Sequence, residues 1–318
     1  MRRIRTTLTF ATVFAISLLI FSPITMAEQT AGLSPKKPDG IMELTVSPTS
    51  TRLELKAGQS TKGEFMIFNS GEVSLDVKVS ANPYSVKNEN YDGDYENETP
   101  RSQIVRWINF DQAEYHLEPR QQETVHFTVN TPQSIPDGGQ YAVLLAETAS
   151  EATSTEGSSF NTIKRVGTLL YASTDGQTKD SGFVKEVSVK GWQKEQPVAF
   201  TQRITNDGNT DFVTTGKATL TSLFGREIAT VIVDEQIVLP DTTRATDKSF
   251  NEKVVPGFYK LSVESTFLGQ THTSEKWVFV APVWLVSLVL IIFLLVIAVI
   301  IWLAGRGKGS RKIKIRGQ

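Results

Sequence analysis

The feature that most constrains this chain is an uncharged apolar run near its end, from Val283 to Leu303. A helix of these 21 residues is about 31 Å long at ~1.5 Å per residue, which matches the hydrocarbon core of a bilayer. Trp284 and Trp302 lie near its two ends, where amphipathic rings prefer the headgroup level. The run therefore predicts one transmembrane helix whose ends are Val283 and Leu303.

Basic residues without any acidic residue follow this run: Arg306, Lys308, Arg311, Lys312, Lys314 and Arg316. Positive charge beside a span marks its cytoplasmic side. Residues 304–318 are therefore predicted to form a basic cytoplasmic tail that touches anionic lipid headgroups. The single span then leaves the preceding domains outside the cell, in a protein of the cell membrane.

The first 27 residues have the pattern of a secretory signal peptide. Arginines at the start precede an apolar run from Leu8 to Phe21, and small residues end at Ala27. This run is too short to span a bilayer, so we predict cleavage after Ala27. An uncleaved N-terminal helix is the alternative interpretation.

The formal net charge of −1 hides an uneven distribution. Three of the 33 basic residues lie in 1–27 and six in 304–318, so the other 24 face all 34 acidic residues and leave 28–303 with a charge of about −10. Nucleic acid is a poor partner for such a surface, because its binding depends on neutralising phosphates. The chain has no cysteine, which excludes disulfides and thiol catalysis and, in an exported protein of this size, indicates a bacterial source.

Between the two ends, the pattern is that of β-strands. A polar linker at 28–40 precedes a first domain at 41–178, where apolar and polar residues alternate from Val73 to Val79. Tyr141–Ala146 and Val166–Ala172 are predicted to pair as a hairpin across a mobile polar connection. Other strands are predicted at 53–55, 63–68, 104–110 and 124–129.

A second domain at 179–280 repeats this organisation, with strands predicted at 184–189, 198–205, 212–220, 227–233 and 259–266. Turn signatures recur in the same order in both halves, beginning with Asn69-Ser70-Gly71 and Asn206-Asp207-Gly208. The sequence therefore predicts an all-β ectodomain of two tandem immunoglobulin-like β-sandwiches, followed by one C-terminal transmembrane helix. Convergent turn chemistry in unrelated β-domains is the alternative explanation of the repeats.

These turn motifs resemble those of the WxL-interacting surface proteins of Gram-positive bacteria. The motifs are 53–59 with 69–71, 136–141, 167–171, 223–227, Leu239-Pro240 with Arg244, and 256–259. The resemblance covers roughly residues 41–280, the span and the tail. It implies two immunoglobulin-like domains, the first associated with peptidoglycan and the second with a host or partner protein, while the acidic insertion near residue 90 departs from the family.

That insertion is the one cluster that suggests a ligand. Oxygen-bearing side chains alternate around a glycine turn, as in a calcium loop, and the candidate ligands are Asn88, Asn90, Asp92, Asp94 and Glu96. Asn88 and Thr99 stand where a calcium loop has an aspartate and a bidentate glutamate. The alternatives are a solvated hairpin tip, or a protein-binding surface to which Tyr84, Tyr91 and Tyr95 contribute. No cofactor beyond this weak calcium site is predicted.

No catalytic motif accompanies this loop. The three histidines are separated in the sequence, and neither a nucleophile elbow nor a zinc-binding helix is present. We therefore predict a non-catalytic cell-surface adhesion or scaffold protein that binds wall material such as peptidoglycan, or another surface protein. The alternative function is that of an accessory subunit of an envelope membrane complex.

Overall fold

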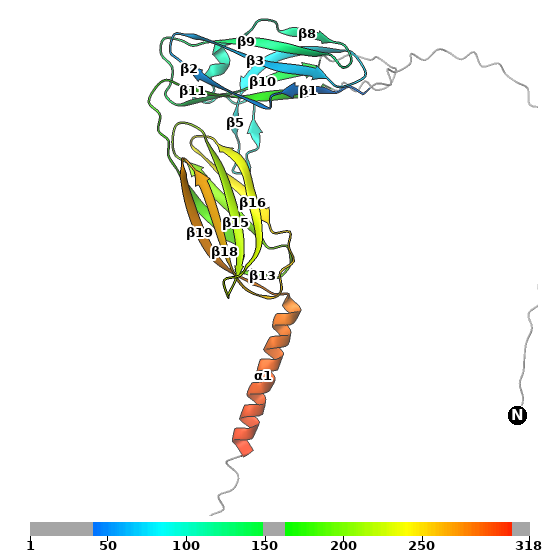
Figure 1. Cartoon of the computed structure of the whole chain (residues 1–318), viewed down its shortest axis with the longest axis vertical. Coiled ribbons are helices and arrows are strands. Elements are labelled where there is room, and N and C mark those ends of the chain that lie inside the picture. The colour runs from blue at the N-terminus through cyan, green and yellow to red at the C-terminus, as the bar shows by residue number, and fades with distance from the viewer. Residues whose placement is uncertain (1–40, 149–162, 307–318) are drawn as a thin grey trace, which may run out of the picture. The chain divides into compact units, whose positions relative to one another are not determined.

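The computed structural model describes residues 41–148 and 163–306, with side chains to 304. This part of the chain is predominantly β-structure and ends in one apolar helix (Figure 1). The predicted all-β chain with a C-terminal helix is thereby confirmed. The signal peptide with its cleavage at Ala27, the linker at 28–40, the loop at 149–162 and the tail from 307 onward lie outside the described residues.

The first β-sandwich consists of a four-stranded sheet, in the order β1-β3-β9-β7, and a five-stranded sheet, in the order β2-β11-β10-β4-β8. The four-stranded sheet contains β1 (Leu44–Ser47), β3 (Ser60–Asn69), β9 (Gln122–Asn130) and β7 (Ile108–Phe110). The five-stranded sheet contains β2 (Ser50–Leu55), β11 (Arg165–Thr174), β10 (Gly139–Thr148), β4 (Leu75–Pro83) and β8 (Glu114–Leu117). One apolar core lies between the sheets, with Phe65 and Phe127 from one and Leu144 and Leu170 from the other.

Two predictions for this sandwich have different outcomes. The hairpin prediction is confirmed, because β10 and β11 pair antiparallel from Gly139↔Ser173 to Glu147↔Arg165. The strand predicted at 104–110 is wrong over its first half, which forms the 3-10 helix η1 (Gln103–Trp107). A local turn explains the difference: the Ser102 hydroxyl donates to the Thr99 carbonyl at 3.0 Å, and Ile104 is fully buried by the tightened backbone.

The second β-sandwich pairs a three-stranded sheet, in the order β12-β14-β17, with a five-stranded sheet, in the order β13-β19-β18-β15-β16. The smaller sheet contains β12 (Gly182–Val189), β14 (Ala199–Asn206) and β17 (Thr242–Ser249). The larger contains β13 (Trp192–Gln193), β19 (Gln270–Val280), β18 (Gly257–Phe267), β15 (Phe212–Ser222) and β16 (Glu227–Val238). Its core includes Phe200 from the smaller sheet and Leu220, Leu261 and Val278 from the larger.

The two sandwiches share a buried asparagine in the repeated turn. Asn69 donates from Nδ2 to the carbonyls of Val73, Leu117 and Glu118 at 2.7–3.1 Å, and its Oδ1 accepts the Gly71 N–H. Asn206 makes the matching contacts, and both side chains are completely buried. The repeated Asn-x-Gly signature thus corresponds to one structural device used twice.

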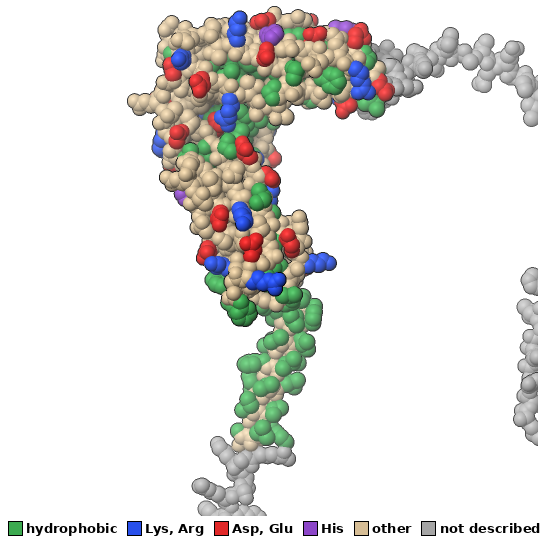
Figure 2. All heavy atoms as spheres, in the orientation of Figure 1, with side chains coloured by type: hydrophobic (Ala, Val, Ile, Leu, Met, Phe, Trp, Pro, Cys, Tyr) green, Lys and Arg blue, Asp and Glu red, His purple; other side chains and the backbone are tan. Residues whose placement is uncertain are grey.

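The helix α1 runs from Val283 to Arg306, so the predicted span lies within it. None of the stretch Val283–Ala304 is buried against the rest of the chain, and apolar side chains surround it (Figure 2). Its length and composition are those of a helix that can cross a membrane. Only two residues separate it from β19, and one of them, Ala281, is buried and donates its N–H to the Gln193 carbonyl.

Candidate functional site at the junction of the two sandwiches

The predicted calcium residues lie on a small hairpin that joins β5 (Ser85–Val86) to β6 (Gly93–Asp94). Asn88 closes the turn: its Oδ1 accepts the N–H of Asn90 at 3.0 Å, and its Nδ2 donates to the carboxylate of Asp92 at 2.7 Å. The Asn88 amide oxygen is therefore engaged with the backbone, and the Asp92 carboxylate with the Asn88 amide nitrogen.

Asp94 is occupied separately. Its carboxylate accepts the Asn97 side-chain amide at 2.7 Å and the backbone N–H groups of Glu96 and Asn97 at 3.2 Å. The hydrogen bond from the Asn97 side chain, with the backbone N–H of Glu96, lowers the pKa of Asp94. Within the described ranges, Asp92, Asp94 and Glu96 do not assemble into a three-ligand metal group. Calcium binding at this hairpin stays a prediction.

The tip of the hairpin contacts the second sandwich instead of solvent. The Tyr91 hydroxyl accepts the Leu239 N–H at 2.7 Å and lies 2.7 Å from the Thr242 hydroxyl, which in turn donates to the Leu239 carbonyl. The Arg244 guanidinium lies 4.3 Å from the centre of the Tyr91 ring, a cation–π arrangement. Tyr91 therefore attaches the hairpin to the β16–β17 turn.

Glu89 supplies an ionic contact beside Tyr91. Its carboxylate lies 2.8 Å from Nε of Arg203 and 3.2 Å from Nζ of Lys185, and its carbonyl accepts the Ala245 N–H at 2.7 Å. The hydrogen bonds from Arg203 and then Lys185 lower the pKa of Glu89. The Glu89 side chain is 39% exposed, and an exposed ion pair contributes little to stability. Its main effect is therefore to fix the register of the contact between the hairpin and the second sandwich.

Behind the hairpin lies a buried cluster of tyrosines. Tyr84, Tyr141 and Tyr171 pack with Leu239 of the second sandwich, and Tyr171 meets the other two rings edge-on at 5.9–6.2 Å. Burial raises the pKa of all three phenols, so they remain protonated at any physiological pH. The cluster supplies apolar contact and hydroxyl donors but no base.

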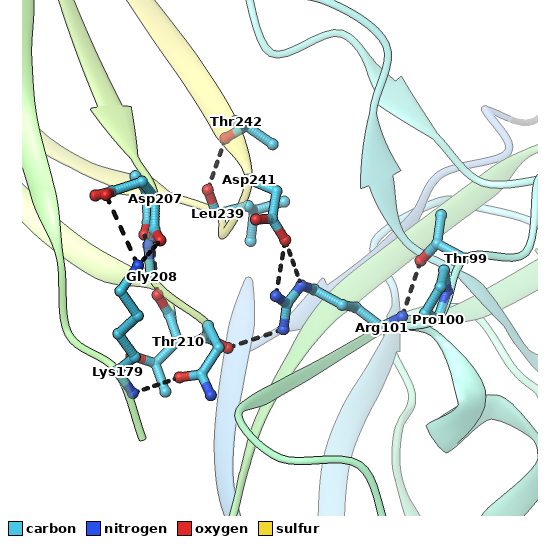
Figure 3. A network of polar contacts seen from close by, with 12 residues as sticks. Thr99, Pro100, Arg101, Lys179, Asp207, Gly208, Thr210, Leu239, Asp241 and Thr242 are labelled. Atoms are coloured by element: carbon cyan, nitrogen blue, oxygen red, sulfur yellow. Dashed lines mark hydrogen bonds and ion pairs between the residues drawn. The ribbon is translucent and has the colours of Figure 1, made fainter. Parts of the chain in front are cut away.

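One arginine reaches across the other side of the junction. Figure 3 shows Arg101 of the first sandwich directed at Asp241 of the second, and Nη2 and Nε lie 2.7 and 3.1 Å from the same carboxylate oxygen. Its Nη1 donates to the carbonyl of Asn209 at 3.0 Å. That carbonyl also accepts the Gly139 N–H at 2.7 Å, and a Cβ placed on Gly138 would lie 2.2 Å from it. The close approach of the Asn209 carbonyl therefore requires glycine at position 138, where φ is +91°.

A pocket of about 480 Å³ opens between these contacts. Its walls include Tyr84, Arg101, Asp137 and Gln140 from the first sandwich and Pro240 from the second. Gln140 is completely buried, its Nε2 donates to the Pro100 carbonyl at 3.3 Å, and its Oε1 has no hydrogen-bond partner. A pocket with aromatic walls, a cation, a carboxylate and a buried acceptor is equipped to bind a ligand.

Sequence reasoning did not find this junction. It selected the hairpin for its acidic residues, whereas the residues that attach it are Tyr91 and Glu89. It gave no role to Arg101 or Gln140, because their partners lie more than 100 positions away or in the backbone. The one available signal is the group Tyr84, Tyr91 and Tyr95, which the sequence predicts only as an alternative, a protein-binding surface.

No family model matches the chain, and no curated protein matches it. Among solved structures, the class 5 fimbriae chaperone CfaA matches with a TM-score of 0.39 and 12% identity, over 74% of this chain and 99% of that one. A chain of the complex between the Salmonella enterica SafA pilin and the SafB chaperone matches with a TM-score of 0.36 and 16% identity, over 74% and 96%. The Pseudomonas aeruginosa CupB2 chaperone matches with a TM-score of 0.34 and 11% identity, over 73% and 99%. At TM-scores below 0.5, these likenesses carry no information about the function of this chain.

Proposed function

We propose that this protein is a non-catalytic, membrane-anchored binding protein whose two immunoglobulin-like sandwiches hold an extracytoplasmic partner at their junction. The observation that carries the proposal is the junction pocket, which both sandwiches line and in which the buried Gln140 Oε1 has no partner. Buried polar atoms are ordinarily hydrogen-bonded, so an unsatisfied acceptor beside a pocket is an argument for a ligand that donates to it.

The anchoring half of the proposal is supported by α1. Its 24 residues are long enough to cross a hydrocarbon core, and none of its apolar surface between Val283 and Ala304 is buried. Such a surface is costly in water and is stable in lipid. The basic residues that follow it in the sequence support an orientation with the sandwiches outside the cytoplasm.

The non-catalytic half is supported by how the charged groups are used. Arg101 and Asp241 are paired with each other, and Glu89 is paired with Arg203 and Lys185. The buried tyrosines keep their protons. The residues that line the pocket include neither histidine nor cysteine, so the geometry favours recognition over proton transfer.

The ligand we favour is extracytoplasmic: wall material such as peptidoglycan, which the resemblance to WxL-interacting proteins implies, or a segment of another surface protein. Both present amide N–H groups to Gln140 Oε1, and acetamido or apolar groups to the tyrosine and proline walls. The experiment below distinguishes peptidoglycan from a protein segment as the ligand.

The test uses the full chain in detergent with purified peptidoglycan sacculi, and in parallel with an envelope extract treated with cross-linker. Ser85→Trp fills the pocket from its wall, and Ser74→Trp is a matched control at an exposed site outside it. Co-sedimentation or cross-linking that Ser85→Trp abolishes and Ser74→Trp keeps would support binding at the junction. Equal binding by both variants would overturn the site. Stoichiometric co-purification of integral membrane proteins with both variants would replace the proposal by an accessory subunit of a membrane complex.

A further inference from the structure

The hairpin between β15 and β16 ends in apolar residues where polar ones are usual. Leu223 is 60% exposed and Phe224 is 95% exposed. The turn itself is well formed, because the Gly225 N–H donates to the Ser222 carbonyl at 3.0 Å and Gly225 has the positive φ of +80° that such a turn requires. The two side chains therefore project from a defined tip into open space.

Other exposed large apolar residues gather at the same end of this sandwich. The register places Ser222 opposite Tyr259 and Phe258 opposite Phe279, so the hairpin tip, the start of β18 and the end of β19 lie together. The exposed side chains at this end are Trp192, Leu223, Phe224, Val255, Phe258 and Trp277, which we call the basal face. An exposed apolar group of this size marks an interaction surface.

The first sandwich does not cover the basal face. Its contacts with the second sandwich lie away from this face. They include Asn209, Asp211, Leu239 and Asp241 at the opposite end, where Phe212 pairs with Val238. The others are the contacts of Glu89 and Tyr91 with the smaller sheet. The basal face therefore needs another occupant.

The connection between β19 and α1 indicates what covers the basal face. β19 ends at Val280 on the basal side and α1 begins at Val283. The connection is held down, because Ala281 donates to the Gln193 carbonyl at 3.1 Å and accepts from the Trp192 indole at 2.8 Å. Figure 2 shows apolar side chains at this end of the second sandwich beside the start of the apolar helix. If α1 crosses a bilayer, the basal face meets the surface of that same bilayer.

We propose that the basal face is a membrane-docking surface, in which Leu223 and Phe224 enter the interfacial region of the phospholipid bilayer that α1 spans. The inference rests on the proposed membrane anchor. Tryptophan and phenylalanine are the side chains that bind this region through apolar contact. Exposed basic residues (Lys190, Lys194, Arg226 and Lys253) and exposed acidic residues (Glu195, Glu227 and Glu252) nearly balance at this end. Docking is therefore driven by apolar burial, depends little on salt, and occurs on zwitterionic lipid.

The absence of cysteine from the whole chain makes a labelling test direct. The full chain is reconstituted into phosphatidylcholine vesicles with one fluorophore-labelled cysteine at a time, and quenching by lipid-attached nitroxides is measured. Arg226→Cys reports on the hairpin tip while Leu223 and Phe224 stay in place. Gln270→Cys is the matched control on the exposed β18–β19 hairpin at the other end of the same sheet, and Leu294→Cys reports whether α1 is in the membrane.

We expect quenching at 226 to be several-fold stronger than at 270, equal at low and high salt, and reduced to the level at 270 by Leu223→Ser with Phe224→Ser. Strong quenching at 294 with equal, weak quenching at 226 and 270 would overturn the docking surface and keep the anchor. Weak quenching at 294 would overturn the anchor itself. Quenching at 226 that survives the double serine variant would overturn the role of Leu223 and Phe224.

Discussion

The Tyr91 hydroxyl of the first sandwich lies 2.7 Å from the Thr242 hydroxyl of the second, and both bond to the backbone of Leu239. Tyr91→Phe removes this bridge and leaves the Leu239 N–H without its partner. An unsatisfied buried donor costs about 1–3 kcal/mol. We expect the variant to lower the free energy of unfolding by that amount in urea titrations. Tyr95→Phe, at a 42% exposed ring, is the control and should be close to wild type; equal effects would argue against the bridge.

Gly138→Ala is expected to separate the sandwiches. The added methyl would lie 2.2 Å from the Asn209 carbonyl, and alanine is strained at φ +91°. Cross-linking between cysteines introduced on the two sides of the junction should fall, with a loss of stability of at least about 1 kcal/mol. Gly191→Ala, where no atom lies within 4 Å of the new Cβ and φ is not in the left-handed region, should change neither quantity.

Asn69→Ala should be among the most damaging single changes in the first sandwich. It leaves three carbonyls and the Gly71 N–H without the side chain that satisfies them, and each buried group costs about 1–3 kcal/mol when left unpaired. Asn206→Ala should act in the same way on the second sandwich. Thermal melting measures both, and Asn130→Ala, at an exposed site, is the comparison; a melting temperature like that of Asn130→Ala would refute the role assigned to the buried amides.

His116 should make a small contribution to stability that depends on pH. Its Nδ1 lies 2.6 Å from Asp76 Oδ1 and its Nε2 lies 3.4 Å from Glu118 Oε1, and these contacts raise the pKa of His116 above 6.5. The contribution is therefore present below pH 6.5 and is lost as the pH rises through the folded-state pKa. An NMR titration should show a pKa above 6.5 in the wild type that decreases in Asp76→Asn; an unchanged value would exclude Asp76 as the main cause.

The effect of calcium on thermal stability tests the predicted metal site in the hairpin between β5 and β6. If the sequence pattern forms a weak site with a dissociation constant of ~10⁻⁴–10⁻³ M, then ~2 mM calcium adds about 0.7–1.8 kcal/mol of stability. In the structure, the carboxylates of Asp92 and Asp94 are bonded to the amides of Asn88 and Asn97, which calcium has to displace. The predicted site requires a higher melting temperature with calcium than with chelator, and equal melting temperatures would retire it. A calcium-dependent rise that Asp92→Asn with Asp94→Asn abolishes would establish the predicted site.

Much of the fold could be predicted from local patterns. The alternation from Val73 to Val79 corresponds to β4, in which Leu75, Val77 and Val79 are buried. The β10–β11 hairpin was recognisable from its two apolar runs. β19 was missed, because most of its residues before Val278 are polar or exposed and give no apolar period.

The junction could not be predicted in this way. Tyr91 and Leu239 are 148 positions apart, and their contact depends on how two finished sandwiches meet. Periodicity reports which face of a strand is buried, and it contains no information about which turn of one domain touches which turn of another. The acidic residues near 90 indicate a metal site by their charge, while the residue that carries the contact is Tyr91, which lies between them.

The short, fixed connection between β19 and α1 also has a mechanical consequence. The chain enters the second sandwich at Gly182 on the junction side and leaves it at Val280 on the basal side. A partner that pulls on the first sandwich while α1 is held stretches β12 and β19 along their own lengths. The eleven residue pairs between β18 and β19, from Gly257↔Val280 to Phe267↔Gln270, then resist in shear together instead of opening one after another. The strand arrangement thus suits a tether under load, whose lifetime is set by its unfolding rate more than by its equilibrium stability.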